Sequence, residues 1–145
     1  MQRVSRASVE VSGEKIAQIS EGLLVLLGVK QGDGETQARW LARKICKLRI
    51  FEDQGGKMNR SVEDISGEIL VVSQFTLYGN CRKGNRPSFA QSAPPDLAEP
   101  LYERFASILE EMGLAVSRGR FAAMMEVELI NSGPVSLMIE SPDNL

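Results

Sequence analysis

Two continuously apolar runs most constrain what this chain can fold into. They are Leu23–Leu27, which follows a glycine, and Ile69–Val72, which follows a glutamate. A strand with one wet face alternates apolar and polar residues, whereas a short continuous apolar run is typical of a strand buried on both faces. We therefore expect both runs to form strands in the interior of the protein.

The rest of the pattern predicts an α+β fold with a mostly antiparallel sheet and hairpins at both ends of the chain. Thr36 is the expected N-cap of the first helix, Asp96 or Pro100 begins the second, and Gly113 ends it. Residues 79–100 form a long loop. The expected helices are residues 36 to 48 or 50 and 96–112, and the expected strands are residues 4–11, 15–20, 23–29, 68–77, 115–117, 124–130 and 135–140.

Length and composition are those of an ordinary globular protein. The chain has 145 residues, 43% hydrophobic and 25% charged, and no linker divides it, so we expect one domain over residues 1–145. Met1 leads into an alternating strand and not into an apolar leader, and the longest apolar run is too short to span a membrane. Cys46 and Cys81 show no paired spacing. These features predict a reduced, cytoplasmic protein without a membrane partner.

The chain contains no histidine. This absence removes the Ser-His-Asp and Cys-His nucleophile systems and the commonest zinc ligand. The acidic residues show no metal-ligand spacing, and the glycines of Gly28–Gly34 match no phosphate-binding loop. Catalysis near neutral pH must therefore use carboxylates, backbone donors, a lysine, or groups that the substrate brings.

Three uncharged polar residues, Ser73, Gln74 and Thr76, follow directly on the second apolar run. Burying their hydrogen-bonding groups without partners costs free energy, so they must bond either the fold or a ligand. Polar side chains at a strand end often satisfy nearby backbone groups, but a strand end that exposes backbone N–H groups can also form an oxyanion pocket. The pattern alone leaves both interpretations open.

The segment Asn131-Ser132-Gly133-Pro134 gives a more specific signal than these polar residues. The pattern favours an ordinary turn between two strands. A cis bond before Pro134 would instead direct two carbonyls to the same side, where they could hold an ammonium group, and only a few per cent of X–Pro bonds in folded proteins are cis.

Arg82, Lys83 and Arg86 form a basic stretch between Tyr78 and Phe89. These charged side chains either keep a surface loop solvated or contact a phosphate backbone. The net charge of −2 and the pI of about 5.3 argue weakly against general nucleic-acid binding, although a local basic patch is compatible with both values.

The segments Ser73-Gln74-Phe75-Thr76-Leu77 and Asn131-Ser132-Gly133-Pro134-Val135-Ser136 resemble the two signature motifs of D-aminoacyl-tRNA deacylases. Further family segments occur in the family's order, so the resemblance covers nearly the whole chain. They are Gln2–Val4, Ala7–Val9, Gly22–Val29, Arg49–Phe51, Gly56–Asn59, Arg86–Phe89 and Gly119–Phe121.

The resemblance implies a barrel-like core with two helices in an intertwined homodimer, with each active site at the subunit interface. It implies hydrolysis of the ester between a D-amino acid, or glycine, and the 3′-terminal ribose of tRNA, without a cofactor. The Gly133-Pro134 bond would be cis, and the pair would enter the other subunit's pocket, hold the substrate's amino group and reject an L side chain by shape. The substrate's own 2′-hydroxyl and a positioned water would assist, which fits the absence of histidine.

The same resemblance implies individual roles. The catalytic segment would be Ser73, Gln74, Phe75 and Thr76, with the Phe75 backbone N–H as oxyanion donor, Ser73 and Gln74 orienting the adenosine and ribose, and Thr76 at the reaction centre. Substrate binding and chiral selection would use Arg3, which braces the Gly-Pro loop, Met125, which lines the adenine pocket, and Asn131, Gly133, Pro134 and Ser136. Contacts to tRNA would come from Arg82, Lys83 and Arg86.

Two departures from the family pattern affect these roles. Ser136 stands where the family usually has threonine, so its hydroxyl rotates more freely. Arg3 lies close to Met1, where the family has a longer first strand, which predicts a looser hold. Both leave open the alternative of a non-catalytic RNA-binding module of the same fold. A synthetase-borne editing domain for L-serine esters and a plain structural homodimer are further alternatives.

Overall fold

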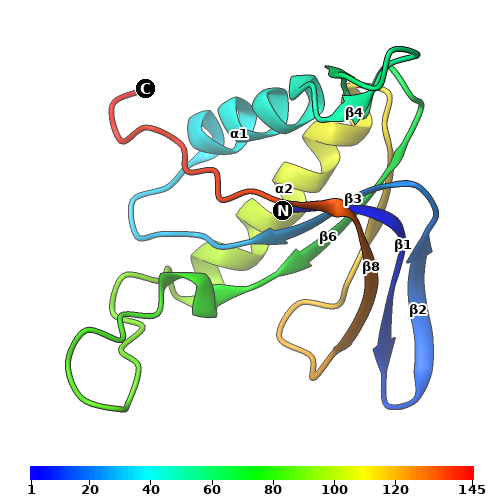
Figure 1. Cartoon of the computed structure of the whole chain (residues 1–145). Helices are drawn as coiled ribbons and strands as arrows, with labels where there is room; N and C mark the ends of the chain where they lie inside the picture. The colour runs from blue at the N-terminus through cyan, green and yellow to red at the C-terminus, as the bar shows by residue number, and fades with distance from the viewer.

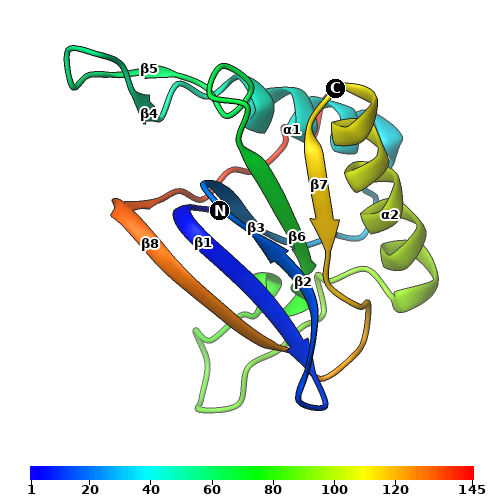
Figure 2. The same cartoon turned by 90° about the vertical axis from the view of Figure 1, so that its right-hand side faces the viewer.

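The structure, a computed structural model that describes residues 1–145, consists of a curved sheet with two helices packed on one face (Figures 1 and 2). Neither helix is long and apolar enough to cross a membrane. In chain order the elements are β1 (Gln2–Val11), β2 (Glu14–Ile19), β3 (Gly22–Leu27), α1 (Glu35–Lys47), β4 (Phe51–Glu52), β5 (Met58–Arg60), β6 (Glu68–Ser73), the 3₁₀ helix η1 (Phe75–Tyr78), α2 (Pro95–Glu111), β7 (Ala115–Arg118) and β8 (Glu126–Ser136).

The sheet bends around β1, which pairs with three strands. Along one edge β1 pairs with β3 through Gln2–Val4 and with β2 through Ala7–Val11, and along its other edge it pairs with β8. All three pairs are antiparallel, whereas β3, β6 and β7 lie side by side in parallel. The mixed sheet is thus barrel-like, and the α+β class with two helices is confirmed.

The interior strands β3 and β6 are buried on both faces, as their continuous apolar sequences predict. Leu23, Val25 and Ile69 pack with the helices in one cluster of buried side chains. Leu24 and Leu70 point to the opposite face and pack with residues of β1 and β2 in a second cluster. Because neighbouring residues of one strand serve different clusters, alternation of apolar and polar residues is absent here.

The predicted hairpin at the C-terminal end of the chain is wrong. β7 pairs with β6, and β8 crosses the molecule to pair with β1. The predicted break at Asn131–Pro134 is wrong as well, because β1 still offers backbone partners there: Val4 lies opposite Asn131 and Gln2 opposite Ser136. Only Arg3 stands between these two pairs, so the four residues between Asn131 and Ser136 must bulge outward beside it.

Both helices begin slightly earlier than predicted. The N-cap of α1 is Gly34 and not Thr36, since the side chain of Gln37 reaches back to accept the Gly34 N–H at 3.0 Å. The helix α2 begins at Pro95, one residue before Asp96, where a proline needs no N–H partner.

The strand β6 is shorter than predicted and ends at Ser73. Its neighbour β3 ends at Leu27, and the Leu27 carbonyl accepts the Gln74 N–H at 2.8 Å. Beyond that point no strand remains to pair with, and the chain turns into η1. The polar residues after the second apolar run therefore leave the sheet.

Tyr102 of α2 links this helix to β6 and to the residue that follows β7. Its side chain is buried, and its hydroxyl donates to the carbonyls of Val71 at 3.0 Å and Gly119 at 3.3 Å. Burial raises the pKa of the Tyr102 hydroxyl to about 12, so it remains a donor at any physiological pH.

We expect Tyr102→Phe to lower the free energy of unfolding by about 1 kcal/mol, because the part-buried Gly119 carbonyl loses its donor and the Val71 carbonyl keeps only the Gly119 N–H, while the ring is kept. Urea unfolding monitored by circular dichroism measures this. The matched control is Tyr78→Phe, because the Tyr78 hydroxyl makes no hydrogen bond within the protein. Equal losses in the two variants would contradict the assigned role of the Tyr102 hydroxyl.

Candidate functional site

A cavity of about 680 Å³ opens where β6 ends. Most of its lining is hydrophobic, with the rings of Phe75, Phe89 and Phe121 among the walls, and its polar groups come from Ser73, Gln74 and a serine of the following loop. A slot with aromatic walls and a few polar groups at one end suits a flat ring that carries hydrogen-bonding substituents.

Two backbone N–H groups beside this cavity, which Phe75 lines and Thr76 does not, have no partner within the protein. Gln74 donates its N–H to the Leu27 carbonyl, but the N–H groups of Phe75 and Thr76 donate to no acceptor within the protein. The side-chain amide of Gln74 donates to the Thr76 hydroxyl, whereas the Ser73 hydroxyl makes no hydrogen bond within the protein. Adjacent free N–H groups at a fixed turn can stabilise a developing oxyanion.

The residue Phe75 is fixed from two sides although its side chain is 56% exposed. The Ser92 hydroxyl donates to the Phe75 carbonyl at 2.9 Å, and the Phe89 ring meets the Phe75 ring edge-on with centroids 5.1 Å apart. Both contacts come from the loop that follows η1. This loop therefore holds the Phe75 ring and the peptide group formed by the Phe75 carbonyl and the Thr76 N–H.

The second motif forms the bulge of β8 opposite Arg3. The Gly133-Pro134 peptide bond is cis, Gly133 has φ +121°, and both residues are exposed. Asn131 closes the base of the bulge, because its side-chain carbonyl accepts the Val135 N–H at 3.1 Å.

The Ser136 hydroxyl holds the far side of the bulge. It accepts hydrogen bonds from the side-chain amides of Asn131 at 2.9 Å and of Gln2 at 3.1 Å. Two donors from different strands thus orient the hydroxyl.

The side chain of Arg3 is only 8% exposed despite its position near the terminus. Its Nε donates to the Ser132 carbonyl at 3.0 Å, and its Nη1 donates to the Ile50 carbonyl at 2.6 Å. The guanidinium carbon also lies 6.0 Å from the centroid of the Phe51 ring. Arg3 therefore connects the bulge of β8 to the chain that enters β4.

Within one chain the Gly133-Pro134 bulge does not reach Ser73 and Gln74, although Leu77 and Ser136, at the ends of the two motifs, both line a third cavity of about 530 Å³. Ser73 and Gln74 line the 680 Å³ cavity, whereas Ser132 and Gly133 line a different, polar cavity of about 440 Å³ together with Arg3. Figure 2 shows that the end of β8 lies near β4 at one end of the molecule, while η1 lies towards the other. A site that uses both motifs is therefore incomplete in a single chain.

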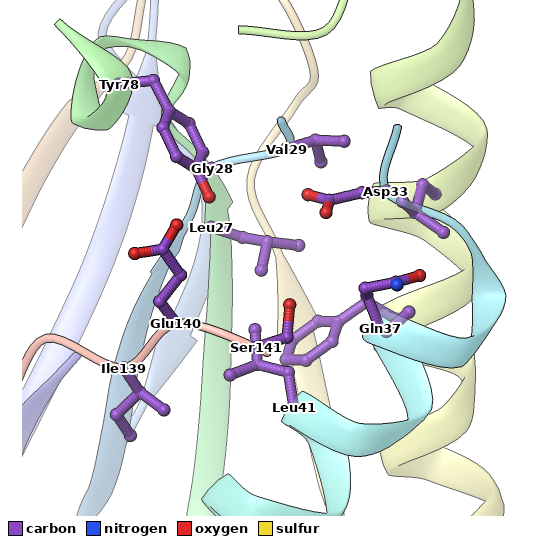
Figure 3. Close-up of a pocket in the computed structure, with 13 residues that line it drawn as sticks. Leu27, Gly28, Val29, Asp33, Gln37, Leu41, Tyr78, Ile139, Glu140 and Ser141 are labelled. Carbon is purple, nitrogen blue, oxygen red and sulfur yellow. The ribbon is translucent and has the colours of Figure 1, made fainter. Parts of the chain in front are cut away.

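A smaller pocket of about 40 Å³ lies behind η1. Tyr78, Asp33 and Glu140 surround it (Figure 3), and burial, followed by these two carboxylates, raises the pKa of the Tyr78 hydroxyl. Its volume suits water molecules and not a substrate. This pocket therefore belongs to the packing beneath η1.

The remaining predicted residues separate into two groups. Met125 lines the 680 Å³ cavity, whereas Arg82, Lys83 and Arg86 are exposed on the loop after η1, with no carboxylate within 4.0 Å. Phe89 and Phe121, which also line this cavity, were indicated only as parts of longer family segments. Neither the patterns nor the resemblance pointed to Ser92 and Ala98, because loop and helix positions that share a cavity have no fixed spacing.

Comparison with known proteins places this chain in a family. The family model described as D-Tyr-tRNA(Tyr) deacylase matches residues 1–140. The chain is 58% identical over 141 residues to the D-aminoacyl-tRNA deacylase of Halalkalibacterium halodurans, with 97% of each chain covered. It is 59% identical over 140 residues to the D-aminoacyl-tRNA deacylase of Heliobacterium modesticaldum, with 97% of this chain and 93% of the relative covered.

Two solved structures have the same fold. One, described as c-Myc DNA Unwinding Element Binding Protein, superposes with a TM-score of 0.91 at 44% identity and covers 97% of this chain and 96% of its own. Another, described as a probable eukaryotic D-amino acid tRNA deacylase, has a TM-score of 0.76 at 18% identity, with 92% of each chain covered, and supports the fold alone.

Proposed function

The chain belongs to the D-Tyr-tRNA(Tyr) deacylase family and is a hydrolase of D-aminoacyl-tRNA, and we propose that its active site is completed across a homodimer. In this proposal the exposed Gly133-Pro134 bulge of one subunit enters the cavity beside Ser73–Thr76 of the other. The single observation that carries the proposal is the separation of the Gly-Pro bulge from the Ser73–Gln74 segment, which line different cavities of one chain. Membership in a family of hydrolases favours this function over an RNA-binding module without turnover.

The cavity binds the 3′ end of the substrate. The terminal adenine occupies the aromatic slot beside Met125, and Ser73 and Gln74 hydrogen-bond the adenosine and its ribose, which explains why the fold leaves the Ser73 hydroxyl unpartnered. The ester carbonyl then lies over the Phe75 and Thr76 amides. Those amides stabilise the oxyanion that forms when the carbonyl is attacked.

Proton transfer does not require a protein base in this proposal. The chain has no histidine, and the one side chain hydrogen-bonded to the Thr76 hydroxyl is the Gln74 amide, which is not a base that could remove its proton. An aminoacyl ester is an activated substrate. The ribose 2′-hydroxyl and a positioned water supply the proton transfer, and the protein contributes orientation and electrostatic stabilisation.

Chiral selection comes from the partner's bulge. The carbonyls of its Gly-Pro pair accept the substrate's ammonium group, and the pair occupies the space that an L side chain would need. Glycyl-tRNA, which has no side chain, is accepted together with many D-aminoacyl esters. Arg82, Lys83 and Arg86 contact the tRNA backbone, and the substrate places the enzyme in the cytoplasm.

Ser92 acts as a positioning residue in this scheme, because its hydroxyl fixes the Phe75 carbonyl and with it the Thr76 N–H of the same peptide group. We expect Ser92→Ala to lower kcat about tenfold and to leave KM within about twofold, since the oxyanion donor loses its orientation while the base slot is kept. Ser92→Thr, which keeps the hydroxyl, is expected to restore most of kcat. An increase of KM alone in Ser92→Ala would contradict this role.

Complementation between two defective subunits tests the shared site. One variant carries Gly133→Ala, and the other carries Ser73→Ala together with Gln74→Ala. Each homodimer is expected to be inactive on D-tyrosyl-tRNA. In a purified heterodimer, one site combines an intact catalytic segment with an intact bulge, so about half of the wild-type activity should return. A heterodimer without activity would contradict the proposal, because two separate single-chain sites would each retain one defect.

A further inference from the structure

The basic side chains of this protein divide into paired and unpaired groups. Of its 17 lysines and arginines, six lie within 4.0 Å of a carboxylate. Most of the others gather in two segments. One is the loop with Arg82–Arg86, and the other extends from the last turns of α1 to the β4–β5 hairpin and contains Arg43, Lys44, Arg49, Lys57 and Arg60.

The part of the second segment on α1 forms a shallow groove of about 520 Å³, which Arg43 and Lys44 line together with Trp40. The Lys44 ammonium lies 5.2 Å from the centroid of the Trp40 ring. Arg43, Lys44 and Arg49 are all exposed. Surfaces that bind a nucleic-acid backbone typically carry exposed cations that have no carboxylate partner and lie close to an aromatic ring.

Three acidic residues of this region already have partners, whereas Glu52 of β4 is exposed and has none within the protein. The Asp53 carboxylate accepts hydrogen bonds from the backbone of Gly55 at 2.8 Å and Lys57 at 3.0 Å, which forms the hairpin turn. Glu63 pairs with Lys47 at 3.2 Å, and Asp64 accepts the Ser61 N–H at 2.8 Å. These carboxylates shape the turn and its neighbourhood, and they leave Lys57 without a counterion.

The fold connects this surface to the Gly-Pro bulge. Through its two hydrogen bonds, Arg3 joins the Ser132 carbonyl of the bulge to the Ile50 carbonyl, which lies between α1 and β4. Figure 2 shows the β4–β5 hairpin projecting beyond the sheet, near the end of β8. A molecule that contacts the bulge therefore also lies close to the β4–β5 hairpin and the end of α1.

We propose that Arg43, Lys44, Arg49 and Lys57 contact the phosphate backbone of the tRNA whose 3′ end occupies the partner subunit's cavity. This inference rests on the proposed function, in which the bulge enters that cavity. The nucleotides that follow inward from the ester are then next to the hairpin and the end of α1, and each carries a phosphate. An acidic protein could bind the same basic side chains. However, the tRNA at the neighbouring site is already a polyanion, so we assign this surface to the tRNA.

The test compares two substrates, D-tyrosyl-tRNA and the D-tyrosyl ester of adenosine, which has no phosphate. The variant changes Arg43, Lys44, Arg49 and Lys57 to glutamine. We expect its KM for D-tyrosyl-tRNA to rise at least about tenfold at low salt with kcat within about twofold, and the slope of log KM against log salt concentration to fall by about one unit for each contact removed. Hydrolysis of the adenosine ester should be unchanged.

Single variants provide a matched control. Lys57→Gln and Lys15→Gln each remove one unpaired lysine from a hairpin, β4–β5 in the first and β1–β2 in the second. We expect only Lys57→Gln to raise KM for D-tyrosyl-tRNA. Equal effects of the two, or an unchanged KM in the fourfold variant, would overturn the inference and leave an acidic protein as the remaining partner for this surface. A wild-type enzyme inactive on both substrates would refute the proposed function instead.

Discussion

Gly133→Ala is expected to lower kcat/KM for D-tyrosyl-tRNA at least about 100-fold, because it displaces the bulge that completes the partner's site in the proposed homodimer. A Cβ atom at this position would lie 2.6 Å from Arg3 Nη2 and 3.1 Å from a methyl group of Val135. Gly133 also has φ +121°, a conformation that L residues with a Cβ rarely adopt. Either the bulge or the Arg3 side chain that is hydrogen-bonded to it must therefore move. Steady-state deacylation kinetics measure the effect.

Gly13→Ala is the control for this variant. Gly13 also has a positive φ, +78°, but a Cβ there would meet no atom within 4 Å. It lies in the turn between β1 and β2, away from both motifs. We expect Gly13→Ala to lose stability and keep its kcat/KM. A Gly133→Ala enzyme with wild-type kcat/KM would show that the bulge does not position the substrate.

Gly22→Ala is expected to prevent folding or to lower the free energy of unfolding by more than about 4 kcal/mol. Gly22 begins β3 beside Glu68 of the parallel strand β6. A Cβ at Gly22 would overlap the Glu68 carbonyl oxygen and lie 2.7 Å from the carbonyl carbon. Because these contacts are with backbone, no side-chain rotation relieves them, and the central strand pair must separate.

Gly34→Ala serves for comparison. A Cβ at Gly34 would have only the Gln37 side-chain oxygen nearby, at 3.7 Å, and we expect a loss below about 1 kcal/mol. Soluble expression and urea unfolding of the two variants measure the difference. Similar stabilities of Gly22→Ala and Gly34→Ala would contradict the close approach of β3 and β6.

The sequence predicted the interior of the fold well because its signals there are local. The continuous runs of β3 and β6 follow from burial on both faces, and the apolar stripes of α1 and α2 have helical spacing. Strand pairing is a property of distant segments, and no local pattern distinguishes a strand that returns to its neighbour from one that crosses the molecule. The partner of β8 was therefore missed, and with it the position of the bulge opposite Arg3.

The candidate site also divides into residues that the sequence indicated and residues that only the structure reveals. The resemblance pointed to both motifs, and the structure places Ser73, Gln74, Phe75 and Met125 around one cavity. Residue patterns left the alternatives for Ser73 undecided, because the answer depends on where its hydroxyl lies relative to other groups. Ser92 and Phe89, which fix Phe75, lie in a loop without periodicity, so only the folded chain reveals their role.

The most direct test of the central claim is the deacylation of matched D-tyrosyl-tRNA and L-tyrosyl-tRNA by the wild-type enzyme, at equal concentrations and against the uncatalysed rate. The account predicts rapid loss of the D ester, while the L ester decays no faster than without enzyme. Equal hydrolysis of both esters would contradict selection by the Gly-Pro bulge, and tRNA binding without hydrolysis of either would contradict the enzyme itself.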